Sequence, residues 1–320
     1  MHEIFINDFG RLRSGWRLLI FLAAFIALIF LLTSALRVVY VLTGPHGPSG
    51  AADIIADFVY RGALLGAALG AGYFCTRLLE GLPWRSLGLT FHAGWLRDLI
   101  FGFVIGFATL VVAVAIANKG LKFSLSNTEW LWIVRSGIGS GALLFVAALA
   151  EEAMFRGYGL QTLTRAKLAW LGVLLTSVPF ALVHLNNPNV VRGVTFANTA
   201  LAGVWLAAAY LRTRSLWLAL GVHWSWNWAL GWFFGLPVSG ANLASHPLLE
   251  ATDKGPFWLT GGSYGLEGGL AGTIALLLVT IYTWRTSLVS ATPELLKMTS
   301  AENPALPAPV LSDRPADEHA

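Results

Sequence analysis

Long apolar segments, separated by short polar connections, are the feature that most constrains the fold of this chain. A helix needs about 20 apolar residues to cross a bilayer core, and segments of that length recur along the chain. They do not alternate with a period of two, which excludes a transmembrane barrel. The sequence therefore predicts an all-α, polytopic membrane protein with about eight transmembrane helices, at residues 16–42, 52–79, 96–118, 135–160, 168–187, 193–211, 215–234 and 262–284.

The charge content agrees with this class. Only 12% of the residues are charged, whereas soluble domains carry about 25%, so the chain cannot cover a water-facing surface. The net charge is +4, but Lys and Arg are scattered between apolar blocks, so we expect the bilayer, and no nucleic acid, as a partner. Cys75 is the only cysteine, which excludes an intrachain disulfide and a cysteine-built metal site. No organic cofactor is predicted.

The distribution of Lys and Arg predicts the orientation. If both termini lie inside, 14 of the 21 basic residues fall on the inner side and 7 on the outer side. Such a bias is typical of cytoplasmic segments. We therefore expect an even number of crossings, with the N- and C-termini in the cytoplasm.

The chain divides into four predicted regions. The first three transmembrane helices occupy residues 1–134, and a core of four helices follows at 135–234. An outer loop and the last transmembrane helix occupy 235–285. Residues 286–320 are rich in proline and small or charged residues, a composition that predicts a disordered cytoplasmic tail.

Glycines spaced four residues apart predict close helix packing, because they let neighbouring backbones approach. They are Gly62, Gly66 and Gly70, Gly102 and Gly106, and Gly137 and Gly141.

A few ionisable residues lie within the apolar segments. An ionisable side chain near the bilayer centre costs about 2.5–3.5 kcal/mol, so each one requires an explanation. Among the acidic residues, Glu151 and Glu152 lie well inside an apolar stretch, and His184 and His223 are the histidines inside predicted spans. These four residues are the first candidates for a functional site.

Helix geometry brings these residues together. If the fourth and fifth spans form a hairpin, Glu151 and His184 lie nearly equally far from its turn and should face each other. Residues four apart share a helix face; these pairs are Glu152 with Arg156, Phe180 with His184, and His223 with Asn227. Three helices, the fourth, fifth and seventh, can therefore direct Glu, His, His and Asn at one point.

Such a group supports the activation of water. A carboxylate and a histidine act as general bases, while His and Asn donate hydrogen bonds to an oxyanion, which is the chemistry of acyl-bond hydrolysis. Two histidines and a glutamate, here Glu151, His184 and His223, are also a ligand set of zinc hydrolases. The residues alone leave a metal-free site and a site with a divalent metal such as Zn²⁺ both open.

Three motifs in sequence order carry a family resemblance. They are E-E-x-x-x-R at Glu151, Glu152 and Arg156, F-x-x-x-H at Phe180 and His184, and H-x-x-x-N at His223 and Asn227. Together, over about residues 145–230, they resemble the CPBP family of intramembrane metalloproteases, bacterial relatives of the type II CAAX prenyl endopeptidase. The resemblance implies that Glu151 and His184 activate water, that Glu152 and Arg156 form a supporting pair, and that His223 and Asn227 stabilise the oxyanion.

The resemblance also implies a substrate class and a location. We expect an endopeptidase of a bacterial inner membrane that cuts a membrane-associated peptide or protein. Two other functions use the same buried Glu and His: a transporter that relays protons or holds a ligand, and a binding protein in bacteriocin immunity. Transporters often show repeated halves, and none is evident here.

Overall fold

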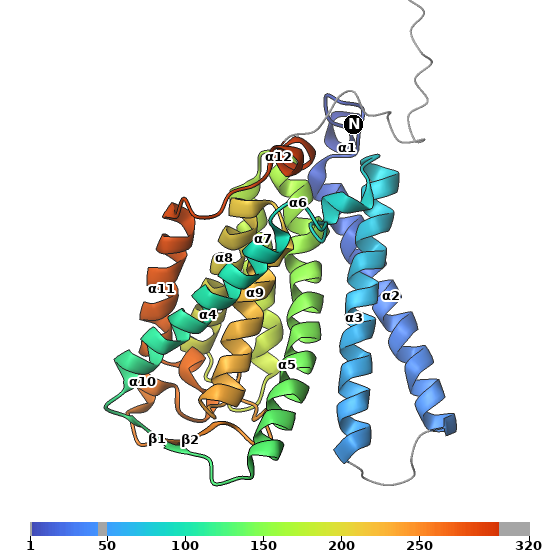
Figure 1. Ribbon diagram of the computed structural model, residues 1–320. Coiled ribbons are helices and arrows are strands. Elements are labelled where there is room, and N and C mark those ends of the chain that lie inside the picture. The colour runs from blue at the N-terminus through green and yellow to red at the C-terminus, as the bar shows by residue number, and fades with distance from the viewer. Residues whose placement is uncertain (1, 44–49, 301–320) are drawn as a thin grey trace, which may run out of the picture.

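The computed structural model describes residues 2–43 and 50–300, and its long elements are helices (Figure 1). The long helices are α2 (Ser14–Thr43), α3 (Gly50–Leu79), α4 (Trp95–Ala117), α5 (Trp130–Glu152), α7 (Ala169–Val183), α8 (Val194–Thr213), α9 (Leu216–Trp228) and α11 (Leu270–Arg285). The shorter ones are α1 (His2–Phe5), α6 (Tyr158–Arg165), α10 (Phe257–Thr260) and α12 (Pro293–Thr299). Short 3₁₀ turns are η1 (Trp84–Leu87), η3 (His184–Asn186), η5 (Gly262–Tyr264) and η6 (Leu266–Gly268); π-helical turns are η2 (Ala153–Gly157) and η4 (Ala229–Phe233).

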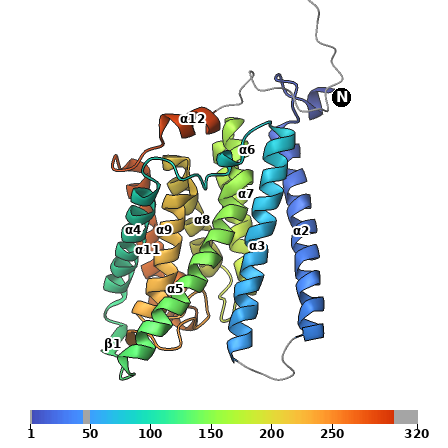
Figure 2. The same ribbon diagram turned by 45° about the vertical axis from the view of Figure 1, so that its right-hand side comes forward.

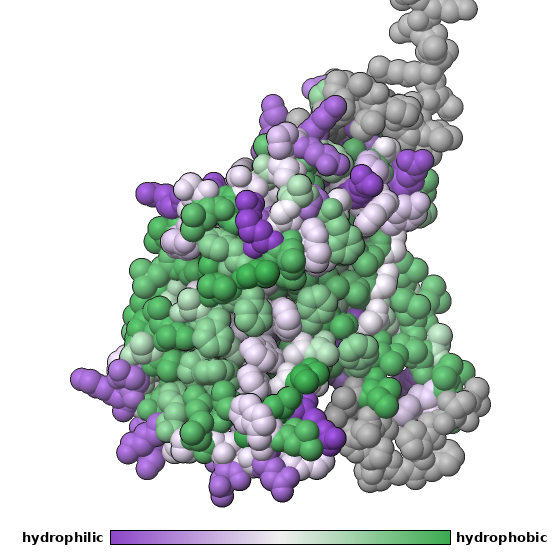
Figure 3. Space-filling model, viewed as in Figure 1, coloured by the Kyte–Doolittle hydropathy of each residue, from purple (hydrophilic) through white to green (hydrophobic). Residues whose placement is uncertain are grey.

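Each predicted span corresponds to one long helix, which confirms the all-α, polytopic membrane fold. Among the described residues, six segments are long and apolar enough to cross a membrane: Ser14–Val41, Ile55–Leu79, Trp95–Ala117, Trp130–Arg165, Ala169–Asn186 and Val194–Thr213. The number eight is not confirmed, because α9 and α11 have only 13 and 16 residues. The space-filling view shows a wide apolar belt, with polar side chains gathered at its two ends (Figure 3).

The helices form two groups. The α2–α3 hairpin lies along one side of a bundle that contains α4, α5, α7, α8, α9 and α11 (Figures 1 and 2). The described N-terminal segment and α12 lie at the same end of the molecule. At the opposite end the loops pair as two short antiparallel strands, β1 (Leu121–Leu125) and β2 (Leu249–Asp253), with Leu121 opposite Asp253. This ribbon was not predicted, since its members are 124 or more residues apart.

The tail differs from the prediction of disorder over 286–320. After α11 the chain packs back onto the bundle, where Val289 and Leu295 are both 1% exposed. A guanidinium nitrogen of Arg212 donates to the carbonyl of Val289 at 3.0 Å, and Thr292 caps α12 by accepting from the N–H of Leu295. Apolar residues at a helical spacing therefore order residues 286–300. Residues 301–320 lie outside the described part.

Helices α4 and α9 pack closely, and glycines of α4 make this contact possible. A Cβ added to Gly106 would lie 2.1 Å from Ser225 Oγ and 2.4 Å from the carbonyl oxygen of Val222. A Cβ on Gly102 would lie 2.3 Å from another α9 carbonyl. The prediction of close packing is thus confirmed for this pair. It is wrong for Gly62 and Gly66, where an added Cβ would meet nothing within 4 Å.

We predict that Gly106→Ala destabilises the protein by about 1–3 kcal/mol, because overpacking forces two backbones apart. Gly62→Ala is the matched control, and it should change the free energy of unfolding by no more than about 1 kcal/mol, in the stabilising direction. Denaturant unfolding in detergent measures both. Equal effects at the two glycines would contradict the role of Gly106 in the α4–α9 contact.

A buried charge cluster joins α2, α3 and α6 at the end where the N-terminus lies. The carboxylate of Glu80 accepts from Arg165 Nε at 3.0 Å and Nη2 at 2.6 Å, and from Arg17 Nη1. All three side chains are at most 2% exposed. Burial opposes the charged form, but Arg165 and Arg17 outweigh it and hold the pKa of Glu80 below its usual value.

A lowered pKa in the folded state stabilises the protein above the ordinary carboxyl pKa of about 4.3, and this stabilisation is lost as pH falls through the folded pKa. We therefore expect Glu80→Gln to lower the free energy of unfolding by about 3 kcal/mol at pH 7, and by less at acidic pH. Glu294→Gln is the control, since its pair with Arg85 is long, at 3.9 Å, and exposed. A pH-independent loss in Glu80→Gln would contradict this interpretation.

Candidate active site

The six candidate residues come from four helices or turns that meet in the bundle. Glu151 and Glu152 end α5, Arg156 lies in the π-helical turn η2, and His184 follows α7. His223 and Asn227 lie one turn apart on α9. A cavity of about 230 Å³ is lined by Glu151, His184, His223 and Asn227. The structure therefore brings together the residues that the sequence selected.

Glu152 and Arg156 form a buried pair, as their spacing predicted. Arg156 Nη1 donates to Glu152 Oε1 at 3.2 Å, and neither side chain is exposed. Arg156 also donates to the carbonyl of Gly203 on α8 at 3.1 Å. The same Glu152 oxygen contacts His223 Nδ1 at 2.9 Å. Glu152 thus joins α5 to α9, a contact that the sequence did not predict.

Glu151 has a different environment from its neighbour. Its side chain is 26% exposed and lines the cavity. Its Oε2 atom accepts no hydrogen bond from the described residues. That oxygen lies 3.7 Å from His223 Nε2, beyond the range of a direct hydrogen bond. The helix spacing predicted His184 opposite Glu151; both histidines border the same cavity, but the ion-pair contact is with His223.

The partners of the two histidines determine which ring nitrogen is protonated. A carbonyl or a carboxylate only accepts hydrogen bonds, so the imidazole nitrogen facing it must donate. His184 Nδ1 lies 2.6 Å from the carbonyl of Phe180, and His223 Nδ1 faces Glu152. In the neutral form of each ring, Nε2 therefore carries the lone pair. The ring of Phe180 lies 4.6 Å from that of His184 and 6.1 Å from that of His223, measured between centroids, and helps to hold both.

Three tryptophans fix α9 against α5. They lie four residues apart on one side of α9 and its π-helical extension, and each indole N–H donates to an α5 carbonyl at 2.9 Å: Trp224 to Gly141, Trp228 to Gly137, and Trp232 to Ile133. A Cβ on Gly137 or Gly141 would meet Trp232 or Trp228. The glycines at these positions therefore make room for indole rings, and this tryptophan ladder sets the height of His223 relative to Glu152.

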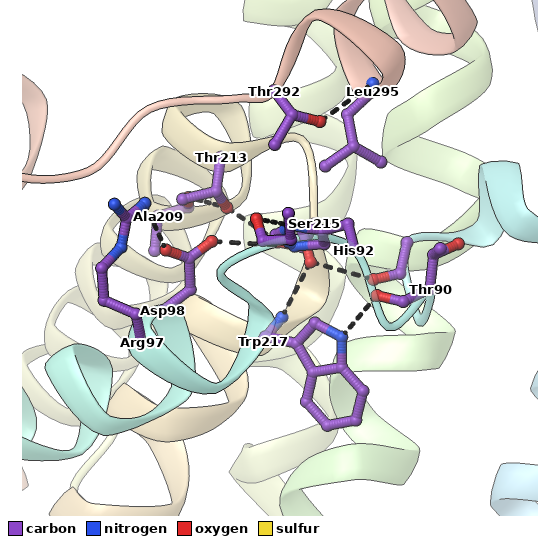
Figure 4. A network of polar contacts seen from close by, with 12 residues as sticks. Thr90, His92, Arg97, Asp98, Ala209, Thr213, Ser215, Trp217, Thr292 and Leu295 are labelled. Carbon is purple, nitrogen blue, oxygen red and sulfur yellow. Dashed lines mark hydrogen bonds and ion pairs between the residues drawn. The ribbon is translucent and has the colours of Figure 1, made fainter.

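A polar network fixes the start of α9 (Figure 4). The carbonyl of Gly88 accepts from Ser215 Oγ at 3.2 Å and from the N–H of Leu216 at 2.9 Å. Trp217 Nε1 donates to the carbonyl of Thr90 at 2.9 Å. In the same loop His92 lies 3.7 Å from the buried Asp98 of α4. The connection before α4 thus anchors the helix that carries His223 and Asn227.

Two charged residues of the cavity wall were not predicted from the sequence as site residues. Glu267 accepts from Trp226 Nε1 at 2.9 Å and from the N–H and hydroxyl of Ser239, both at 2.7 Å. It thereby ties the loop after α9 to the cavity. Arg61 of α3 also lines the cavity and pairs with Asp57 at 2.9 Å. Both residues lie near the ends of predicted spans. Charged side chains are common there, so their sequence positions did not indicate a functional site.

The predicted metal ligands can be tested by their positions. In the part of the chain that the structure describes, no group of three or more His, Cys, Asp or Glu side chains is placed to hold a metal ion. The Nε2 lone pairs of both histidines suit a metal, but the arrangement with Glu151 does not form a ligand cluster. We therefore propose no reaction step that uses a metal ion.

The fold and the cavity define a class: a helical membrane protein with a Glu, His, His and Asn site inside its bundle. Residues 128–229 match the family model described as Type II CAAX prenyl endopeptidase Rce1-like. This match supports the resemblance given by the motifs. The matched segment runs from the start of α5 to the end of α9 and contains all six candidate residues. The chain matches no curated protein.

Proposed function

We propose that the protein is an intramembrane endopeptidase, which hydrolyses a peptide bond of a membrane-associated peptide or protein. The observation that carries the proposal is the position of Glu151: its Oε2 atom accepts no hydrogen bond from the described residues, and its side chain lines the same cavity as His184, His223 and Asn227. A carboxylate oxygen without a hydrogen-bond donor can accept a proton from water.

In the proposed reaction, Glu151 with His184 Nε2 accepts a proton from a water molecule as its oxygen attacks the carbonyl carbon of the substrate. The amide of Asn227 donates to the oxyanion that forms. When the carbon–nitrogen bond breaks, the proton returns from Glu151 to the leaving amine. Glu152 and Arg156 do not touch the substrate in this scheme; they hold His223.

His223 takes its proposed role through Nε2. Because Nδ1–H donates to Glu152, Nε2 can donate to the oxyanion beside Asn227 only when the ring carries both protons. Glu151 and Glu152 flank the ring, and two carboxylates stabilise that positive charge. Glu151, His184 and His223 would have to move closer together to hold a divalent metal such as Zn²⁺, because they do not form a ligand cluster in the described structure.

We also propose the orientation in which both described chain ends face the cytoplasm, in a bacterial inner membrane. The two-to-one bias of Lys and Arg supports this orientation. Cysteine accessibility tests it, with the buried Cys75 replaced by Ser and a single cysteine introduced at Lys297 or Lys122. A membrane-impermeant reagent added from outside intact cells should label the cysteine at 122 and not the cysteine at 297.

A peptide library tests the activity. The purified protein in liposomes is mixed with membrane-associated peptides, with and without a prenylated C-terminus, and mass spectrometry identifies the products. We expect an internal cut in a subset of peptides; metal content measured on the same sample, and activity after chelation, decide between the metal-free and metal-dependent forms. Proton-coupled uptake that is lost in His223→Ala, with no peptide cut, would instead favour a transporter.

A further inference from the structure

A second cavity lies apart from the candidate active site and shares no lining residue with it. Its volume is about 850 Å³. It is bordered by the N-terminal segment, by the start of α2 and by the turn between α6 and α7. Candidate spans begin at Ser14 and Ala169 and end at Arg165 around it. The cavity therefore lies where the apolar part of the membrane gives way to the lipid headgroups.

The walls of this cavity combine cations with apolar surface. Arg13, Arg165 and Lys167 line it together with one carboxylate, Asp8. The remaining wall is largely apolar and includes Trp16, Leu18, Leu19 and Leu175. The side chains of Leu19 and Leu175 are 55% and 42% exposed. A molecule that fills this site must therefore present an anionic group next to a hydrocarbon chain.

The buried cluster behind the wall adds a hydrogen-bond donor. Arg165 pairs with the carboxylate of Glu80 through Nη2. Arg165 is 2% exposed, and its Nη1 atom has no acceptor among the described residues although the side chain lines the cavity. The backbone N–H groups at the start of α2 contribute a partial positive charge beside it.

We propose that this cavity binds an anionic phospholipid of the surrounding membrane. Its phosphate lies between Arg13, Lys167 and the start of α2, and an acyl chain follows Leu19 and Leu175. Basic pockets between transmembrane helices at the headgroup level recognise anionic lipids in this way. A lipid fits better than free phosphate, because the apolar wall would otherwise face water.

The test uses the full-length protein in detergent with added phosphatidylglycerol, phosphatidylcholine or inorganic phosphate. Thermal unfolding and native mass spectrometry measure binding. We expect stabilisation and a retained lipid with phosphatidylglycerol alone. Each cation removed should weaken the affinity about fivefold, so the double variant Arg13→Gln/Lys167→Gln should bind roughly 25-fold more weakly.

The matched control is Lys119→Gln/Lys122→Gln, which removes two cations at the opposite end of the molecule. It should retain the response to phosphatidylglycerol. Equal stabilisation by phosphatidylcholine, an equal response to inorganic phosphate, or an unchanged affinity of the Arg13/Lys167 variant would each overturn the proposal. Because these residues lie outside the active-site cavity, the result does not depend on whether the protein cuts peptides.

Discussion

Glu151→Gln should abolish peptide cleavage while the protein stays inserted and folded. Glutamine has nearly the same shape but cannot accept a proton, so the general base is lost. Removal of such a group lowers the rate by about 10²–10⁴-fold. Stability should change little, because Glu151 Oε2 accepts no hydrogen bond from the described residues. Single-turnover cleavage of a peptide from the library, with the melting temperature measured on the same sample, checks both expectations.

Glu129→Gln is the matched control for this substitution, since Glu129 immediately precedes the other end of α5 and lies outside the cavity. It should cleave at the rate of the unaltered protein. If Glu151→Gln retained proteolysis with an unchanged melting temperature, Glu151 would not be the base, and the proposed mechanism would fail even if the protein were a protease.

The candidate site was accessible to sequence reasoning because its members are both rare and regularly spaced. Ionisable residues inside apolar spans are costly, so Glu151, Glu152, His184 and His223 stood out individually. The i, i+4 spacing then added Arg156 and Asn227 to the same helix faces. Both signals are local: the spacing of four residues predicted the pairing of Glu152 with Arg156, and the length of the apolar segments predicted the positions of the long helices.

What the sequence did not predict depends on contacts between distant segments. Glu152 meets His223, 71 residues later, across the α5–α9 interface, where the tryptophan ladder holds α9 against α5. Glu267 lines the cavity from a loop. The sequence around it is rich in glycine and does not indicate that position. The glycines were ambiguous for the same reason: Gly106 and Gly62 belong to similar patterns, but only Gly106 faces another backbone.

The second large effect concerns the buried pair of Glu152 and Arg156. Glu152→Gln leaves the guanidinium of Arg156, which is 0% exposed, without its charged partner. Breaking a buried ion pair from one side costs about 3–5 kcal/mol. We therefore expect a large loss of stability in Glu152→Gln, and a similar loss in Arg156→Met, measured by denaturant unfolding in detergent.

The double variant Glu152→Leu/Arg156→Met separates two roles of this pair: its contribution to the stability of the fold and the orientation of His223 by Glu152. Replacing both charges by apolar side chains of similar volume removes the uncompensated charge, so most of the stability should return. Cleavage should not return, because His223 Nδ1 loses the carboxylate acceptor that lies 2.9 Å away and the ring is no longer oriented. With KM nearly unchanged and kcat reduced, Glu152 is a positioning residue for His223. A stable double variant that cleaves normally would show instead that the pair serves folding alone.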